Sequence, residues 1–187
     1  MKIHKLITSI GKEKLPEEWK KLIIVAIHKK GDKPIVIIVG AYHLPTTYKM
    51  LSSILPSRLI PYAKEIIGDH QCGFRRNRST VIHIFCIRQI LEKKWEYNEE
   101  VHQLFIDFKK AYDSVRREVL YTILIEFGIP AKLVRLIKIS LTETYSRVRV
   151  SKNVSDRFPI RNGLKQGDAL LPMLFNFALE YAIGGFR

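Results

Sequence analysis

The sequence is short of acidic residues. Of its 187 residues, 18 are Asp or Glu and 32 are Lys or Arg, which gives a formal net charge of +14. A chain with this balance repels cationic partners and attracts polyanions. The basic residues are spread along the chain instead of gathering in one tail, which favours a charged cleft or face. Nucleic acid is therefore the leading expected partner, and an acidic membrane surface is the second.

Long hydrophobic runs and cysteines are also scarce. No apolar run reaches the roughly 18 to 20 residues that a membrane span needs, and residues 1–7 are too polar for a signal peptide. The two cysteines, Cys72 and Cys86, form no CxxC pair, which excludes a disulfide framework and a typical zinc site. These absences indicate an intracellular protein, cytoplasmic or nuclear. Of the two partners considered, we therefore retain nucleic acid and expect no membrane.

The hydrophobic content of 47% is enough for the core of one domain, or at most two small ones. Apolar residues recur with both helical and strand spacing, so we expect a mixed α+β fold. Helices are predicted at 48–55, 80–95, 115–127, 133–141 and from Leu170 onward; strands are predicted at 22–27, 35–39, 145–150 and 157–160. Pro56 and Pro61 are expected to break or kink the first of these helices.

The most informative stretch is residues 103–115. Its apolar residues place Asp107 at the end of a predicted buried strand, and Asp113 opens the next amphipathic helix. A carboxylate at the end of an apolar strand is costly to bury unless it is paired or holds a metal, and Mg²⁺ accepts such ligands. In so basic a chain, this pattern suggests phosphoryl transfer on nucleic acid. The alternative is that Asp107 and Asp113 are ordinary turn or capping residues.

Two basic loops are candidate phosphate or nucleic-acid contacts. Residues 68–78 combine glycine, Phe74 and the arginines Arg75, Arg76 and Arg78, and basic side chains beside an aromatic ring suit a nucleic-acid strand. A second loop places Lys29 and Lys30 next to Gly31. Either loop can equally be a solvated turn.

Four segments, in this order, resemble the reverse transcriptases of non-LTR (LINE-type) retrotransposons. Residues 105–113 (FIDFKKAYD) resemble the first catalytic motif, and residues 163–176 (GLKQGDALLPMLFN) resemble the next. Residues 71–80 (QCGFRRNRST) resemble the segment that precedes both motifs, and residues 19–32 resemble the entry to the domain. The likeness covers the chain from about Leu15.

The resemblance implies a right-hand polymerase fold, with fingers at about 15–100 and a partial palm at about 101–187. It implies an RNA-directed DNA polymerase that uses an RNA template, a DNA primer, dNTP and two Mg²⁺ ions. In this family Asp107 would bind the metal ions and Tyr112 would lie under the sugar and exclude ribonucleotides. Gln166, Gly167, Lys29 and Lys30 would contact the nucleotide, and Arg75, Arg76, Arg78 and Lys165 would contact nucleic acid.

The sequence also departs from the family pattern. The aromatic-x-Asp-Asp hairpin and the thumb would follow a helix that ends near Ile183, whereas the sequence ends at Arg187. We therefore expect the chain to be inactive alone. Residues 34–43 lack the expected arginine, which suggests a shifted reading frame. The alternatives are a non-catalytic protein that binds RNA or RNA–DNA hybrid, and a retrotransposon relic without function.

Overall fold

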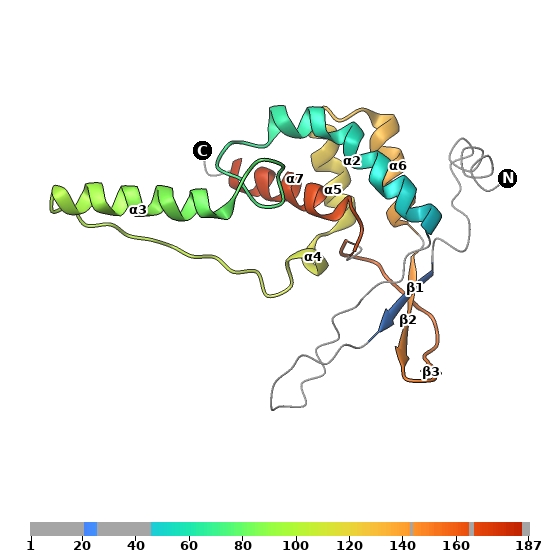
Figure 1. Cartoon of the computed structure of the whole chain (residues 1–187). Coiled ribbons are helices and arrows are strands. Elements are labelled where there is room, and N and C mark those ends of the chain that lie inside the picture. The colour runs from blue at the N-terminus through green and yellow to red at the C-terminus, as the bar shows by residue number, and fades with distance from the viewer. Residues whose placement is uncertain (1–20, 26–45, 143, 165–166, 185–187) are drawn as a thin grey trace.

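The computed structural model describes residues 21–25, 46–142, 144–164 and 167–184, which form a group of helices and one small sheet that extends below them in the view of Figure 1. The helices are α2 (Thr46–Ile66), α3 (Thr80–Glu96), α4 (Ala111–Ser114), α5 (Arg117–Glu126), α6 (Ala131–Leu141) and α7 (Leu171–Gly184). The strands are β1 (Lys21–Val25), β2 (Tyr145–Val150), β3 (Asn153–Val154) and β4 (Phe158–Pro159). The expected mixed α and β architecture is confirmed.

Helices α2, α5, α6 and α7 pack against one another, and we call these four helices the body. Its fully buried side chains include Tyr48, Leu59, Leu124, Ile137, Leu174 and Phe177. These residues come from both sides of position 100 and belong to one hydrophobic core. The helical stripe predicted at 115–127 forms one wall of the body, because Leu120, Tyr121 and Leu124 of α5 are buried.

Helix α5 ends where the sequence predicts. Gly128 has a φ of +74°, a left-handed conformation that glycine adopts without strain. The amide of Ile129 then donates to the carbonyl of Leu124 at 3.0 Å, which satisfies one carbonyl of the last turn. Pro130 follows and begins the turn into α6, so α5 and α6 lie next to each other in the body.

The sheet is built on β2. Strand β1 pairs parallel to β2, with Lys21 opposite Tyr145, whereas β3 and β4 pair antiparallel to β2. The predicted strands at 22–27, 145–150 and 157–160 are therefore confirmed within the described residues, and Arg147 and Arg149 are exposed as expected. Asn153 begins the short strand β3, which lies between β2 and β4 in the sequence. The expected strand at 35–39 lies outside the described residues.

Of the break or kink predicted at the prolines of α2, the break is wrong. Helix α2 runs from Thr46 to Ile66 through both Pro56 and Pro61. Each proline removes one backbone hydrogen bond, but buried neighbours on the same helix, Leu55, Leu59 and Ala63, anchor its apolar face in the body. Packing therefore outweighs the local loss of helical hydrogen bonds.

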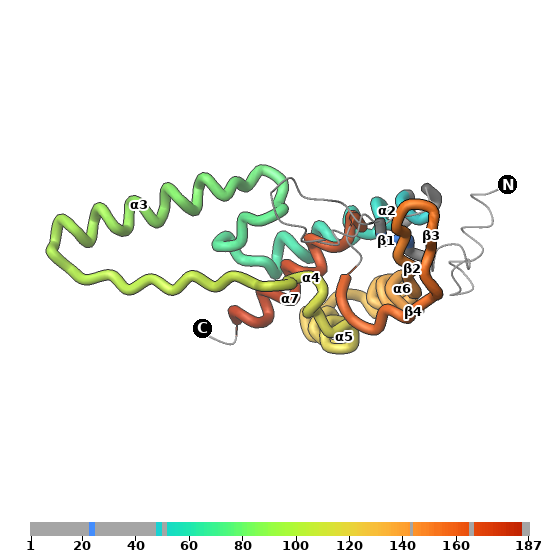
Figure 2. The backbone as a smooth tube through the Cα atoms, turned by 90° about the horizontal axis from the view of Figure 1, so that it is seen from below, coloured from blue at the N-terminus to red at the C-terminus, as the bar shows by residue number. Residues whose placement is uncertain are grey.

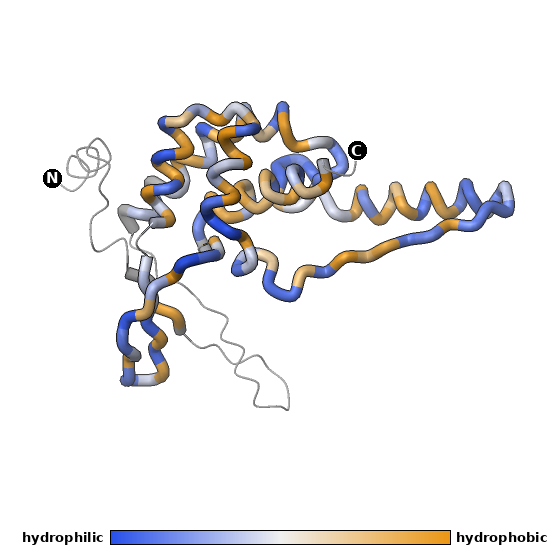
Figure 3. The backbone as a smooth tube through the Cα atoms, turned by 180° about the vertical axis from the view of Figure 1, so that it is seen from behind, coloured by the Kyte–Doolittle hydropathy of each residue, from blue (hydrophilic) through white to orange (hydrophobic). Residues whose placement is uncertain are grey.

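The segment from α3 to residue 110 projects from the body, and we call residues 80–110 the arm (Figures 1 and 2). Ser79 caps α3, with its side chain accepting from the amide of Val81. Yet α3 buries none of its residues. Figure 3 shows hydrophobic positions along both α3 and the returning segment, and Trp95 and Leu104 are 86% and 85% exposed.

The predicted buried strand at 103–107 is wrong, because residues 101–108 are exposed and form no strand. A strand needs a neighbour to satisfy its backbone groups and cover its apolar side chains. The described sheet consists of β1 to β4 and offers this segment no such neighbour. Asp113 also does not open the long amphipathic helix: it lies in the separate short helix α4, and α5 begins only at Arg117.

Candidate nucleic-acid and nucleotide site

The two segments that carry the strongest sequence motifs, residues 105–113 and 163–176, meet in the structure. The amide of Leu164 donates to the carbonyl of Tyr112 at 3.0 Å, and the amide of Gly163 donates to the carbonyl of Val115 at 2.9 Å. Gly163 has a φ of +79°, and a Cβ at this position would lie 3.0 Å from the Cα of Asp113. Only glycine allows this close approach, so the two motifs are joined through their backbones.

Aromatic rings complete this junction. The ring of Tyr112 packs edge-on against Phe175 of α7, with centroids 5.2 Å apart, and Phe108 packs edge-on against the same ring at 6.0 Å. Tyr112 is half-buried. One edge of its ring is thus fixed against α7 while part of the side chain stays accessible, an arrangement that suits a residue that contacts a ligand.

Arg117 donates hydrogen bonds to residues at the same junction. It was not among the residues predicted from the sequence. Its side chain is 6% exposed. Its Nε donates to the carbonyl of Gly163 at 2.8 Å, and its Nη1 donates to Leu141, to Ile160 at 3.1 Å and to Thr144 Oγ1 at 3.2 Å. One guanidinium therefore connects α5 to the end of α6, to Ile160 directly after β4, and to the loop around Gly163, which we call the glycine loop.

A signal for Arg117 was present in the sequence. Arg117 precedes Leu120, Tyr121 and Leu124 by three, four and seven positions, which places a charged residue on the apolar face of α5. A charge in that position requires buried acceptors. The acceptors are backbone carbonyls that only the tertiary fold assembles.

Tyr48 and Asp168 form a second buried link. The hydroxyl of Tyr48 donates to Asp168 Oδ2 at 2.5 Å, and Asp168 Oδ1 accepts from the amide of Leu170 at 2.9 Å. Burial and the adjacent carboxylate raise the pKa of Tyr48 well above its usual value, so it stays protonated and donates. The contact fixes the start of α7 against α2. Gly167, which precedes Asp168, is exposed and has a φ of +87°.

The arginine loop predicted at 68–78 is confirmed as a loop, and it is attached to α7. The amide of Gly68 donates to Glu180 Oε2 at 3.2 Å, and His70 Nε2 lies 3.1 Å from the same oxygen. Nearer the start of α7, Asn176 Nδ2 donates to the carbonyl of Gly73 at 3.0 Å. These contacts give the loop a fixed position on the helix that also carries Phe175.

The three arginines of this loop differ in their contacts. Arg75 Nη1 donates to the carbonyls of Gly68 and Gln71 at 2.7 and 3.0 Å, so it maintains the shape of the loop. Arg78 forms an ion pair with Asp69. Arg76 is exposed and makes no ion pair with a described residue. Of the three, Arg76 is the one whose charge is left for a ligand.

These arginines line a cavity of about 460 Å³ between α2, the loop and α7, which we call the arginine cleft. Its other lining residues include Lys64, Phe74, Met173 and Asn176. The Phe74 ring is 78% exposed. A basic cleft with an accessible aromatic ring is the arrangement that holds a single strand, through phosphate contacts and base stacking. The cleft brings together the arginines that the sequence singled out.

Asp107 is exposed in the returning segment of the arm. Among the described residues, no three His, Cys, Asp or Glu side chains gather as metal ligands. Asp107 therefore belongs to no such cluster, and the described part of the chain does not supply a full set of ligands for Mg²⁺. The predicted contacts Lys29, Lys30, Lys165 and Gln166 lie outside the described residues. Within those residues, no helix is both long and apolar enough to cross a membrane.

Comparison with known proteins links these features to one family. Residues 27–187 match the sequence profile described as "Reverse transcriptase (RNA-dependent DNA polymerase)". The chain is 29% identical over 169 residues to "RNA-directed DNA polymerase from mobile element jockey" of Drosophila melanogaster, covering 86% of the chain and 18% of that protein. It is 28% identical over 174 residues to "Retrovirus-related Pol polyprotein from type-1 retrotransposable element R2" of Popillia japonica, covering 89% of the chain and 23% of that protein.

A third relative, "Probable RNA-directed DNA polymerase from transposon BS" of Drosophila melanogaster, is 28% identical over 171 residues, covering 86% of the chain and 18% of that protein. The expected kinship with the reverse transcriptases of non-LTR retrotransposons is thus confirmed. The chain spans less than a quarter of the length of these relatives.

Proposed function

Because the chain belongs to the reverse transcriptase (RNA-dependent DNA polymerase) family, we propose that it is the fingers and partial palm of an RNA-directed DNA polymerase of a non-LTR retrotransposon. One observation carries the proposal. The two motif segments meet through the Leu164–Tyr112 and Gly163–Val115 hydrogen bonds, although about 50 residues separate them in the sequence. A nucleotide site assembled from both motifs requires this contact.

The individual roles follow from the family resemblance together with these positions. Tyr112, at the junction, is the residue proposed to exclude ribonucleotides. Gly167, exposed just before α7, is proposed to line the nucleotide with Gln166, and the arginine cleft is proposed to hold the template strand. We also propose that Lys29 and Lys30 contact the triphosphate and that Lys165 contacts nucleic acid. The proposed division of the chain is fingers at about 15–100 and partial palm at about 101–187.

Asp107 is proposed as one metal-binding carboxylate of the whole polymerase. Mg²⁺ bound there would stabilise the charge that develops during nucleotidyl transfer. Because no cluster of three His, Cys, Asp or Glu side chains is found among the described residues, we propose that the remaining ligands of the metal come from outside them. We accordingly propose that the chain does not catalyse polymerisation by itself.

The test uses a chimaera in which residues 27–187 replace the matching segment of the jockey polymerase. We expect the chimaera to extend a DNA primer on an RNA template, and Asp107→Asn to abolish extension. Asp156→Asn changes an exposed aspartate outside both motifs and should leave extension intact. Equal activity of the two variants would disprove the role of Asp107. Tyr112→Ala should raise the incorporation of ribonucleotides relative to deoxyribonucleotides.

A second candidate function is binding of RNA or RNA–DNA hybrid without catalysis. The observation that favours it is the arginine cleft, which needs no residue outside the described part of the chain. Binding that depends on phosphate contacts weakens steeply as salt concentration rises. A folded but inactive chimaera would favour this candidate over the polymerase.

The binding test measures fluorescence anisotropy of a labelled RNA–DNA hybrid with the 187-residue chain across a range of salt concentrations. Arg76→Ala should weaken binding and lower the slope of log K against log salt by about 0.7 to 0.9, the value for one lost phosphate contact. Arg88→Ala, an exposed arginine on α3, is the matched control and should change neither. A chain that shows no cooperative thermal melting would favour the third reading, a relic without function.

A further inference from the structure

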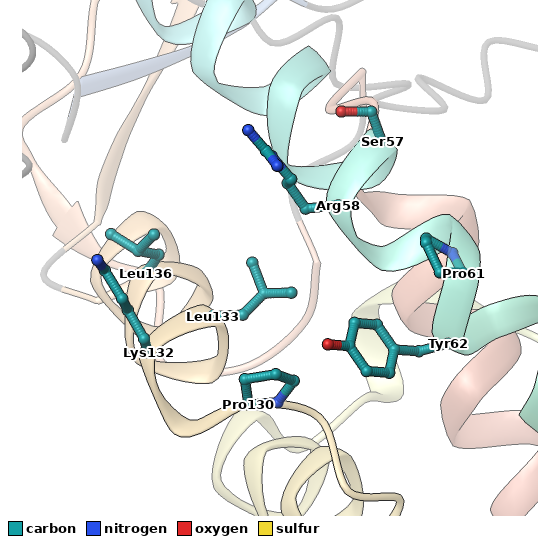
Figure 4. Close-up of a pocket in the computed structure, with 8 residues that line it drawn as sticks. All are labelled: Ser57, Arg58, Pro61, Tyr62, Pro130, Lys132, Leu133 and Leu136. Atoms are coloured by element: carbon teal, nitrogen blue, oxygen red, sulfur yellow. The ribbon is translucent and has the colours of Figure 1, made fainter.

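Helices α2 and α6 enclose a groove of about 640 Å³ on the surface of the body (Figure 4). Its residues include Arg58, Pro61 and Tyr62 from α2 and Lys132, Leu133 and Leu136 from α6. In Figure 4 the side chain of Leu133 lies in the space between the two helices and the Tyr62 hydroxyl points toward it. The volume is within the range of about 300 to 1,000 Å³ that ligand sites occupy.

This groove is separate from the arginine cleft. The residues of α2 that line the groove are Ser57, Arg58, Pro61 and Tyr62, whereas those that line the arginine cleft are Ile60, Ala63, Lys64 and Ile67. With about 100° of rotation per residue, these two sets lie on largely opposite faces of the helix. A ligand in the groove would therefore leave the proposed nucleic-acid cleft free, and the inference does not depend on the proposed function.

The floor of the groove is apolar and its rim is basic. Leucine and proline side chains supply most of the floor, and Leu133 and Leu136 are only half-buried. Arg58 and Lys132 are exposed on opposite helices and form no ion pair with a described residue. Among the residues that the structure describes, no acidic side chain lines the groove. An occupant that matches it presents apolar side chains inward and carboxylates at both edges.

We propose that the α2–α6 groove is a docking site for an acidic amphipathic helix of a partner protein. Such a helix places apolar anchors at i, i+3 or i+4 and i+7 into a groove of this kind, with acidic residues along its flanks. The net charge of +14 accelerates the approach of an acidic partner. Single-stranded nucleic acid is the less favourable occupant, because leucine and proline cannot stack with bases and Tyr62 is the one aromatic side chain among the described residues that line the groove.

The experiment titrates the full chain into a fluorescein-labelled amphipathic peptide that carries leucines on one helical face and glutamates on both flanks. A second peptide keeps the leucines and replaces every glutamate by lysine. We expect the acidic peptide to bind and the lysine peptide not to bind. The double variant Arg58→Glu/Lys132→Glu should bind the acidic peptide at least about tenfold more weakly. It should also gain affinity for the lysine peptide.

Lys49→Glu is the matched control, since Lys49 is an exposed cation on α2 that does not line the groove. It should bind the acidic peptide as the unmodified chain does. Lys49→Glu changes the net charge by as much as Arg58→Glu alone, so equal loss of affinity in these two single variants would show attraction to overall charge and overturn the proposal. Absence of acidic-peptide binding would also overturn it. The proposal would also be overturned if single-stranded RNA displaced the peptide and if this RNA binding required Arg58 and Lys132. The groove would then be a nucleic-acid site.

Discussion

The body and the arm are built from similar residues but differ in what covers them. In the body, Leu59, Leu124, Leu174 and Phe177 are buried against one another. In the arm, α3 contains comparable apolar residues, yet none is buried. Helical spacing of apolar residues therefore specifies a helix and its face, but the partner of that face has to be supplied by other parts of the chain or by another chain.

The two regions are also stabilised differently. The arm relies on local interactions: the Ser79 cap, the Arg88–Glu92 pair at 2.7 Å and the Lys93–Glu96 pair at 3.3 Å. Local interactions of this kind are individually weak. The body adds burial and the hydrogen bonds of Arg117. Substitutions should therefore affect the free energy of unfolding strongly in the body and weakly in the arm.

The largest difference is expected for a matched pair of phenylalanines. Phe177→Ala removes a ring that is 0% exposed and should lower the free energy of unfolding by about 3 to 5 kcal/mol. Phe85→Ala removes a ring of α3 that is 59% exposed and should lower it by less than about 0.5 kcal/mol. Urea unfolding followed by circular dichroism measures both. Similar losses would mean that the arm is packed in solution.

A matched pair of arginines should give the next largest contrast. Arg117→Ala leaves the carbonyls of Gly163, Leu141 and Ile160 without their donor and should destabilise the chain by about 2 to 4 kcal/mol. Arg117→Lys keeps the charge and part of the hydrogen bonding, so it should recover some of that loss. Arg88→Ala, in the arm, should not change the urea midpoint measurably. If Arg117→Ala left the free energy of unfolding unchanged, the hydrogen bonds of Arg117 would not be what maintains the junction.

Alkaline pH should destabilise the body. Burial raises the pKa of Tyr121 from 10.0 to about 12, and burial and Asp168 raise that of Tyr48. Because the folded-state pKa lies above the unfolded one, the protonated hydroxyls stabilise the fold. This stability is complete below about pH 10 and is lost as pH rises toward about 12.

The size of this effect for Tyr121 is of the order of 2 kcal/mol, and urea midpoints measured from pH 8 to pH 12 give the profile. The double variant Tyr48→Phe/Tyr121→Phe has no such hydroxyls and should lose less stability over the same interval. An identical profile in the variant would assign the alkaline transition to other groups.

The smallest effect on stability is expected from polar substitutions in the arm. Trp95→Ser with Leu104→Ser changes side chains that are almost fully exposed, so the urea midpoint should stay constant. The exposed apolar area falls, however, and binding of the dye ANS and self-association at high protein concentration should both decrease. A large loss of stability instead would indicate that the arm folds onto the body.

Many local features were predictable from the sequence because they depend on neighbours in the chain. The Ser79 cap, the Gly128 helix end and the alternation of residues 145–150 belong to this group. The motif segments and the arginine loop were predictable from composition, order and family resemblance. The continuous path of α2 through Pro56 and Pro61 was not, because packing of its apolar face overrides the local effect of each proline.

The sequence by itself determined the charge, the family, most helices and which segments carry the family motifs. The tertiary structure decided which of them meet: Gly163 against Asp113, Arg117 beneath the glycine loop, and Tyr48 on Asp168. It also decided that residues 103–107, though apolar, form no strand within the described fold. The physical reason is that strands and buried charges need distant partners, whereas helices satisfy their own backbone within a few residues.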